Sequence, residues 1–155
     1  MIYNKKVLEH FTNPRNAGEL KDPDAIGKVG NIVCGDVLWI YIKVKKDKDG
    51  KEVIDDIKFK TFGCVAAIAT SSITTELVKG KTIEEALKIT EKEIIEGLGG
   101  LPKAKVHCSL LAVRALREAI YQYLKKSGRE IPEWLEKEHE RIERQTDAVE
   151  KRYNT

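Results

Sequence analysis

The stretch Leu101-Pro-Lys-Ala-Lys-Val-His-Cys108 places an imidazole and a thiol side by side, and it leads into the most periodic segment of the chain. From Val106 onward, apolar residues recur at the spacing of an amphipathic helix with one buried face. These positions are Val106, Leu110, Val113, Leu116, Ile120 and Leu124. A glycine at position 128 is typical of the residue that follows a helix end. We therefore expect a core helix that carries the histidine-cysteine pair at its start.

Two segments upstream of this helix alternate with period two and predict strands. The apolar face of the first is formed by Leu38, Ile40, Ile42 and Val44. A hairpin-type turn, Asp47-Lys-Asp-Gly50, leads into the second. Its apolar face is expected to continue with Val53, Ile57 and Phe59. With a weaker strand signal at 27–33, these segments predict a small three-stranded antiparallel sheet with one face to bury.

Helical segments flank the strands and predict the layer that covers the sheet. Residues 3–12 form a short amphipathic segment, which Asn13-Pro14 ends because the residue before proline avoids the helical conformation. Residues 65–79 predict a second helix. Two capping-box patterns, Thr82–Glu85 and Thr90–Glu93, predict two short helices before a glycine-rich turn. The expected fold class is α+β, with helices packed on one face of the sheet.

The composition changes after Ile131-Pro132. Residues 133–152 are dense in charges of both signs, and their only regular apolar line is Leu135, Ile142 and Val149. A line with one residue every second turn is too narrow for a core face, so we expect an exposed helix. The chain is accordingly divided into a domain at 1–130 and a charged helical C-terminal extension at 131–155.

Length, charge and cysteine content limit the functional classes. A chain of 155 residues is one ordinary domain, and 28 basic against 25 acidic residues give too little net charge to indicate nucleic-acid binding. No apolar run reaches the roughly 18 residues of a membrane span, and the N-terminus does not resemble a signal peptide, so a cytoplasmic protein is expected. Three cysteines in a reducing compartment favour metal binding or redox chemistry over disulfides.

The cysteines lie at junctions between the expected elements. Cys34 and Cys64 fall in short glycine-containing loops, and Cys108 falls in the first turn of the core helix. A single cysteine is more often a small buried hydrophobe, but none of these lies on the apolar stripe of its neighbouring helix. The positive end of a helix dipole favours thiolate at Cys64 and Cys108, and Lys103 and Lys105 add positive charge. We therefore predict that the thiols converge as metal ligands.

The spacing of the thiols indicates the kind of metal site. Structural zinc ligands usually come in close C-x-x-C pairs, whereas Cys64 lies 30 residues after Cys34 and 44 residues before Cys108. Convergence from separate loops is compatible with a [2Fe-2S] cluster, which needs four ligands. Asp36 or His107 would supply the fourth. Carboxylate and imidazole hold cluster iron more weakly than thiolate, so such a cluster should be labile.

Other interpretations of these polar residues stay open at this point. An aspartate after glycine is commonly a turn residue, and Asp36 fits that role as well as a ligand role. Lys105 could be the ion-pair partner of Asp36 in an empty site. The other two histidines, His10 and His139, are predicted to lie on solvated helix faces.

Taken together, the motifs carry a family resemblance. The chain resembles the IscU scaffold of iron-sulfur cluster assembly, also found as the N-terminal module of NifU, over residues 1 to about 127. The matching motifs are Cys34-Gly-Asp36, Phe62-Gly-Cys64, Thr70-Ser-Ser72 and Leu101-Pro-x-x-Lys105-x-His107-Cys108. The resemblance implies a carrier protein rather than an enzyme. Such a scaffold receives persulfide sulfur from a pyridoxal-phosphate-dependent cysteine desulfurase, adds Fe²⁺ and electrons from a donor such as ferredoxin, and passes a [2Fe-2S] cluster to acceptor apoproteins.

The resemblance also implies roles for individual residues. Cys34, Cys64 and Cys108 would be cluster ligands, with Cys108 as the persulfide acceptor. Asp36 and His107 would be exchangeable fourth ligands. Lys105 would be a nearby cation, and Zn²⁺ could occupy the cluster-free form.

Departures from the family pattern narrow the expected partners. Leu101-Pro-Lys-Ala-Lys105 differs from the family segment that a dedicated Hsp70-type chaperone recognises, which argues against that partner. No partner nucleic acid or membrane is expected, and whether two chains share a cluster as a homodimer stays open. The alternative function is a zinc-binding sulfur relay that accepts persulfide from the desulfurase. A zinc hydrolase and a redox-sensing thiol protein are further alternatives, although the chain lacks an H-E-x-x-H pattern.

Overall fold

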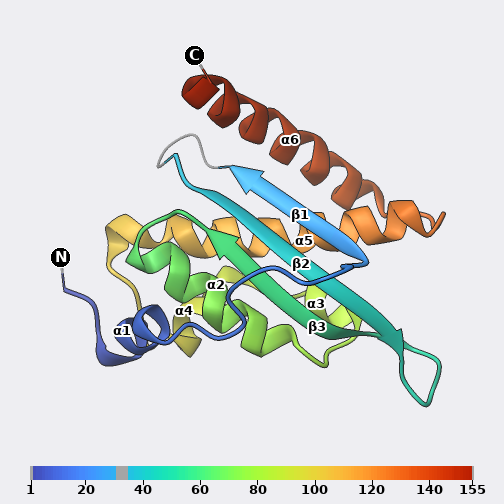
Figure 1. Ribbon diagram of the computed structural model, residues 1–155, viewed down its shortest axis with the longest axis horizontal. Helices are drawn as coiled ribbons and strands as arrows, with labels where there is room; N and C mark the ends of the chain where they lie inside the picture. Colours follow the sequence, from blue (N-terminus) through green and yellow to red (C-terminus); the bar gives the residue numbers. More distant parts are fainter. Residues whose placement is uncertain (1, 31–34, 155) are drawn as a thin grey trace.

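The computed structural model describes residues 2–30 and 35–154 and confirms the α+β class. One antiparallel sheet has the strand order β1-β2-β3 (Figure 1). Its strands are β1 (Ala25–Gly30), β2 (Val37–Lys46) and β3 (Glu52–Thr61). The α-helices are α1 (Lys5–Thr12), α2 (Val65–Val78), α3 (Ile83–Leu87), α4 (Glu91–Gly97), α5 (His107–Lys126) and α6 (Glu133–Asn154), and a 3₁₀ turn spans Lys103–Lys105. None of the helices in the described ranges is both long enough and apolar enough to cross a membrane.

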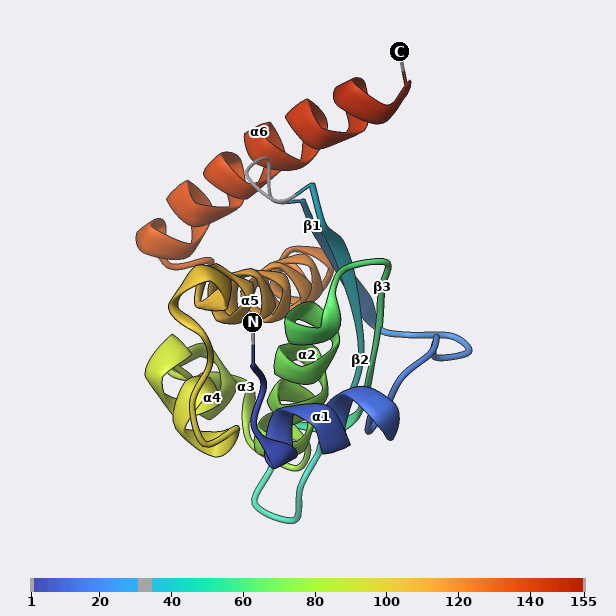
Figure 2. The ribbon, with the colours of Figure 1, turned by 90° about the vertical axis from the view of Figure 1, so that its left-hand side faces the viewer.

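Helices α2 and α5 lie side by side against one face of the sheet (Figure 2). Leu38, Ile40 and Ile42 of β2 are buried beneath them, as the alternation predicts. Strand β1 begins at Ala25, two residues before the predicted segment, and comes very close to α5. A Cβ atom on Gly27 would lie 2.3 Å from the carbonyl oxygen of Ala115, so only glycine permits this contact.

The apolar face of β3 differs from the prediction at one end. The pairing of β2 with β3 shifts register after Lys43, because Lys43 pairs with Asp56 while Val44 pairs with Ile54. The extra residue is a β-bulge, which reverses the alternation on its far side. Ile54 therefore joins Ile57 on the core face, where period two alone had placed Val53.

The buried face of α5 is broader than the predicted stripe. Val106 precedes the helix and is exposed, whereas Leu111, Ala112 and Ala119 are buried although they lie outside the predicted line. Helix α5 contacts the sheet, α2 and α6, so it buries more than one side. The apolar spacing located the helix correctly and underestimated how much of its surface is covered.

Helix α6 is not the exposed helix that the sequence predicts. Leu135, Ile142 and Val149 are all buried, because α6 packs along β1 and α5 (Figures 1 and 2). A narrow line suffices since Gly30 has no side chain there, and a Cβ on Gly30 would lie 3.2 Å from Val149 Cβ. The Gly30 N–H also donates to Thr146 Oγ1 at 3.0 Å.

The prediction of a solvated His139 is also wrong. Its ring stacks on Tyr121 of α5, with the ring centroids 3.9 Å apart. Nδ1 is hydrogen-bonded to the Glu118 carboxylate at 2.6 Å. Burial raises the pKa of Glu118, and the hydrogen bonds from Gln122 and His139 counteract that rise. The packing of α6 on α5 therefore depends on these polar contacts as well as on the buried residues Leu135, Ile142 and Val149.

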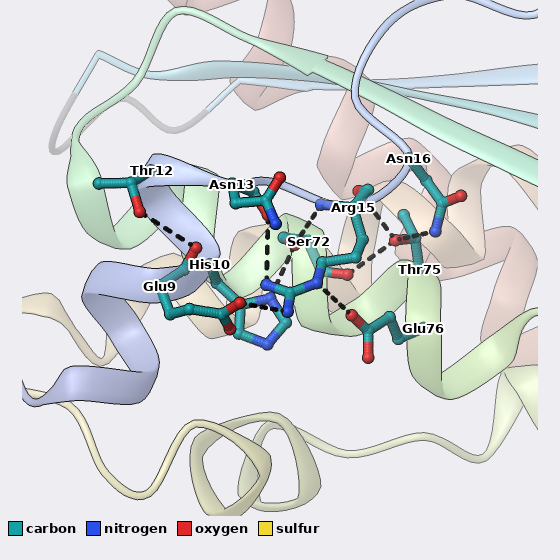
Figure 3. A network of polar contacts seen from close by, with 9 residues as sticks. All are labelled: Glu9, His10, Thr12, Asn13, Arg15, Asn16, Ser72, Thr75 and Glu76. Carbon is teal, nitrogen blue, oxygen red and sulfur yellow. Dashed lines mark hydrogen bonds and ion pairs between the residues drawn. The ribbon is translucent and has the colours of Figure 1, made fainter.

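His10 is buried as well, which contradicts its predicted solvated position. Its Nδ1 is 2.8 Å from Ser72 Oγ, and the same oxygen accepts the Arg15 N–H at 2.9 Å. Around them, Asn16 donates to Thr75, and the Arg15 guanidinium pairs with two carboxylates (Figure 3). These hydrogen bonds and ion pairs hold α1 and the loop after it against the middle of α2.

The outer edge of β3 is occupied by two loops. The Gly18 N–H donates to Phe59 O at 2.8 Å, and the Phe59 N–H donates to Asn16 O at 2.9 Å. Farther along, the Ile54 N–H donates to Lys81 O at 2.9 Å. At these positions the backbone of the edge strand already has partners.

Candidate metal centre

Three of the predicted site residues meet at one end of the sheet. One potential ligand atom each from Asp36, Cys64 and Cys108 lies within 4.8 Å of the others. The Cys64 and Cys108 sulfurs are 4.0 Å apart, about twice the length of a disulfide bond. Cys34 lies outside the described residues. The structure thus brings together two thiols and a carboxylate that are far apart in the sequence.

Each group is placed by the end of a regular element. Asp36 directly precedes β2, Cys64 is the N-cap residue of α2, and Cys108 is the second residue of α5. Both sulfurs therefore lie at helix N-termini, where the helix dipole places partial positive charge. Cys64 is half-buried and Cys108 is 1% exposed, so Cys64 is the more accessible sulfur.

The Asp36 carboxylate has an oxygen without a protein partner. Oδ2 is buried, and it has no hydrogen-bond partner among the described residues. A Cβ on Gly63 would lie 2.9 Å from this oxygen, so the neighbouring loop makes room for the carboxylate only because it has glycine there. Leaving a buried acceptor unpaired costs free energy. A cation bound to this oxygen would remove that cost.

His107 lies at the rim of the same group. Its Nε2 is 3.6 Å from Cys108 Sγ, and the side chain is partly exposed. A nitrogen donor is therefore close to the sulfur pair.

Lys105 interacts with the thiols rather than principally with Asp36. The pKa of the Lys105 ammonium is raised chiefly by the negative charge of the Cys64 thiolate, with smaller effects of Tyr3 and Cys108. Asp36 is not among the groups that shift this pKa, so nothing here supports the ion pair with Asp36 that the sequence left open. A cation at this place offsets negative charge that builds up when the thiols ionise.

Tyr3 is a neighbour of the site that the sequence reasoning missed. Burial raises the pKa of its phenol, and the charges of Cys64 and Cys108 raise it further. The residue precedes α1 and lies within segment 3–12, which the sequence predicts as one short amphipathic helix. The sequence carries no local signal for this proximity, because it depends on how α1 packs on the domain.

Comparison with known proteins places the chain in a family. Residues 2–130 match the family described as the NifU-like N terminal domain. The chain belongs to this family. The resemblance predicted from the motifs is therefore confirmed.

Several relatives of this NifU-like chain are named scaffold proteins. The iron-sulfur cluster assembly scaffold protein IscU 1 of Archaeoglobus fulgidus is 58% identical over 146 residues, which cover 92% of each chain. The IscU scaffold protein of Aquifex aeolicus is 51% identical and covers 91% of each chain. The IscU scaffold protein of Haemophilus influenzae is 49% identical; the match covers all of that protein and 83% of this chain. These names describe carriers rather than enzymes.

Solved structures show the same fold. The N-terminal part of a NifU-like protein from Brucella abortus has a TM-score of 0.61 and 26% identity, and the match covers 81% of this chain and 96% of that one. A SUF-system scaffold from Fervidobacterium islandicum has a TM-score of 0.59 at 23% identity, over 76% of this chain and 96% of that one. The second likeness concerns the fold alone.

Proposed function

We propose that this protein is a scaffold on which a labile [2Fe-2S] cluster is assembled and from which it is transferred to acceptor apoproteins. The observation that carries the proposal is the grouping of Asp36, Cys64 and Cys108, with one carboxylate oxygen unpaired. The scaffold names of the relatives support it. Cys34 completes the proposed thiolate set, as the motif predicts.

The mixed donor set explains why the cluster would be labile. Thiolates are soft ligands that suit cluster iron, whereas the Asp36 carboxylate is a hard donor that holds it weakly. His107 lies close enough to the sulfur pair to take the place of Asp36 as the fourth ligand. Exchange between two weak donors opens a coordination position without unfolding the site.

Sulfur delivery needs a thiolate acceptor, and we assign this role to Cys108 on the family motif. Because Cys108 is 1% exposed, the assignment requires the site to open before the persulfide reaches this sulfur. Its thiolate would attack the outer sulfur of a persulfide on the cysteine desulfurase. A new S–S bond forms on Cys108, the old S–S bond breaks, and the desulfurase cysteine leaves as a thiolate. Conversion of that sulfur to bridging sulfide takes electrons, which a donor such as ferredoxin would supply.

The location of the first persulfide tests this assignment. After incubation with desulfurase and cysteine, mass spectrometry should find the added sulfur on Cys108 preferentially. Modification confined to Cys34 or Cys64 would overturn the assignment.

A zinc-binding sulfur relay is the second candidate, because two thiolates and a carboxylate also suit Zn²⁺. Anaerobic incubation with desulfurase, cysteine and Fe²⁺, followed by absorption and Mössbauer spectroscopy, separates the two functions. A scaffold gives the spectra of a [2Fe-2S] cluster, and the cluster moves to an added apoprotein. Tightly held zinc without any cluster would replace the scaffold proposal with the relay.

A further inference from the structure

One hydroxyl group joins the two loops that supply ligands to the metal centre. The pairing of β2 with β3 ends at Leu38 and Thr61. Beyond this pair, the backbone before β2 leads back to Asp36, and the backbone after β3 leads forward to Cys64. The Thr61 hydroxyl donates to Val37 O at 2.8 Å and accepts the Gly63 N–H at 3.1 Å.

These two backbone groups are direct neighbours of the ligands. Val37 follows Asp36, and Gly63 precedes Cys64, so each bond holds the peptide next to a ligand residue. A hydroxyl can donate one hydrogen bond and accept others, and Thr61 uses both capacities across the gap between the loops.

The packing between the loops leaves little tolerance for movement. The Phe62 side chain points away from the core and is 78% exposed. Gly63 comes so close to the Asp36 carboxyl that a Cβ atom would lie 2.9 Å from both Cγ and Oδ2. A small shift of the loop would therefore change the distance between the carboxylate oxygen and the Cys64 sulfur.

We infer that Thr61 is a positioning residue of the metal centre, which sets the separation of Asp36 from Cys64 through its bonds to Val37 O and Gly63 N–H. This inference rests on the proposed function, since it needs Asp36 and Cys64 to bind one metal site. Thr61 itself is not a ligand.

Cobalt binding tests the role, because Co²⁺ takes similar ligands to Zn²⁺ and its spectrum reports the coordination geometry. Co²⁺ is titrated anaerobically into the metal-free protein, and the thiolate-to-cobalt charge-transfer band and the ligand-field bands are recorded. Thr61→Val keeps the shape of the side chain and removes both hydrogen bonds. It should weaken Co²⁺ binding about fivefold to tenfold and alter the ligand-field bands.

Two further variants separate positioning from general stability. Thr61→Ser keeps the hydroxyl and should restore affinity and spectrum to those of the parent. Thr74→Val removes a buried hydroxyl that donates to Thr70 O at 2.6 Å within α2, so it should lower the melting temperature without changing Co²⁺ binding. If Thr61→Val does not fold, Thr61→Ala is titrated in its place.

The outcomes separate this inference from the proposed function. A folded Thr61→Val protein with the parent's affinity and spectrum overturns the positioning role and leaves the metal centre standing. A Thr61→Ser protein as impaired as Thr61→Val also overturns it. If the parent protein shows no thiolate-to-cobalt band, the metal centre itself fails, and the positioning role fails with it.

Discussion

Helix α2 carries two polar clusters that differ in how their atoms are satisfied. At its start, Cys64 lies within 4.8 Å of Asp36 and Cys108 donor atoms, and Asp36 Oδ2 has no partner in the described chain. In its middle, Ser72 receives the Arg15 N–H and bonds to His10. Burial does not explain the difference, because Ser72 and Cys108 are both almost fully buried.

The difference lies in whether hydrogen-bond donors meet acceptors. In the middle of α2, donors face acceptors, so the protein completes its own hydrogen bonds and the cluster is structural. At the start of α2, two sulfurs and a carboxylate meet, and one carboxylate oxygen has no hydrogen-bond partner in the described chain. A cation bound to the unpaired Asp36 oxygen would satisfy it. The comparison therefore separates a proposed ligand site from a structural network on one helix.

The largest expected effect is the loss of metal affinity in Cys64→Ser. A hydroxyl is a poor replacement for a thiolate ligand. Substitution of a residue that only supports a ligand already lowers metal affinity by about tenfold to a hundredfold. Zn²⁺ binding, measured by competition with a chelator, should weaken by more than about a hundredfold. Ser72→Ala is the matched control on the same helix and should bind Zn²⁺ like the parent. Equal Zn²⁺ affinities in Cys64→Ser and the parent would show that Cys64 is not a ligand.

Metal binding should also stabilise the fold. At a free Zn²⁺ concentration a hundred times the dissociation constant, linkage predicts an increase of about 2.7 kcal/mol in the free energy of unfolding. Urea titrations with and without Zn²⁺ measure it. Ser72→Ala should have a lower free energy of unfolding than the parent but should show the full increase with Zn²⁺. Cys64→Ser should lose that increase. An increment that survives in Cys64→Ser would place the metal elsewhere.

A smaller effect is expected from Ser72→Ala on the metal-free protein. The change leaves His10 Nδ1 and the Arg15 N–H without their shared partner, and an unpaired buried polar group costs about 1–3 kcal/mol. Urea unfolding should show a loss of that size. Ser127→Ala removes an exposed hydroxyl that donates to Tyr123 O and should cost less than about 0.5 kcal/mol. Equal losses in the two variants would show that the network is not structural.

The smallest expected effect is the contribution of His10 in this network to the pH dependence of stability. Burial lowers the pKa of His10, Arg15 and Lys6 lower it further, and Glu76 and Glu9 oppose the shift. Because the folded-state pKa lies below the ordinary value of 6.5, the unfolded chain binds the proton more readily. His10 therefore contributes stability above that value, and this stability is lost as the pH falls through the folded-state pKa.

Urea unfolding from about pH 7.5 down to about pH 5 measures this loss. The decrease in the free energy of unfolding should be smaller in His10→Gln, which has no proton to gain in this range. Ser72→Ala, which leaves His10 in place, serves as a control for the lost hydrogen bond. Identical pH profiles for His10→Gln and the parent would contradict the assigned cause.

Periodicity predicted most elements of this fold, and its errors have local physical causes. The alternation of β2 and the spacing of α5 each reflect one buried face, which the sequence displays directly. In β3, a single extra residue before Asp56 shifts the register, and period two cannot reveal it. In α6, the narrow line of Leu135, Ile142 and Val149 is enough because β1 presents a glycine.

Site residues were predictable where motif and chemistry coincide. Asp36, Cys64 and Cys108 stand beside glycines or rigid turns and have the chemistry of ligands, so they could be named from the sequence. His10 could not be placed, because its partner Ser72 lies 62 residues away and a serine on a helix gives no signal. Thr61 and Tyr3 were missed for the same reason: their roles depend on which loops come together.

The occupied edges of the sheet limit how other molecules can attach. Many proteins capture an extended peptide by pairing it with a bare strand. Here α6 contacts β1, and its Thr146 side chain accepts the Gly30 N–H. On the other edge, the 16–18 and 80–81 segments form backbone hydrogen bonds with β3. An incoming chain would find no vacant ladder at these positions. Recognition at these positions would therefore have to use side chains rather than strand addition.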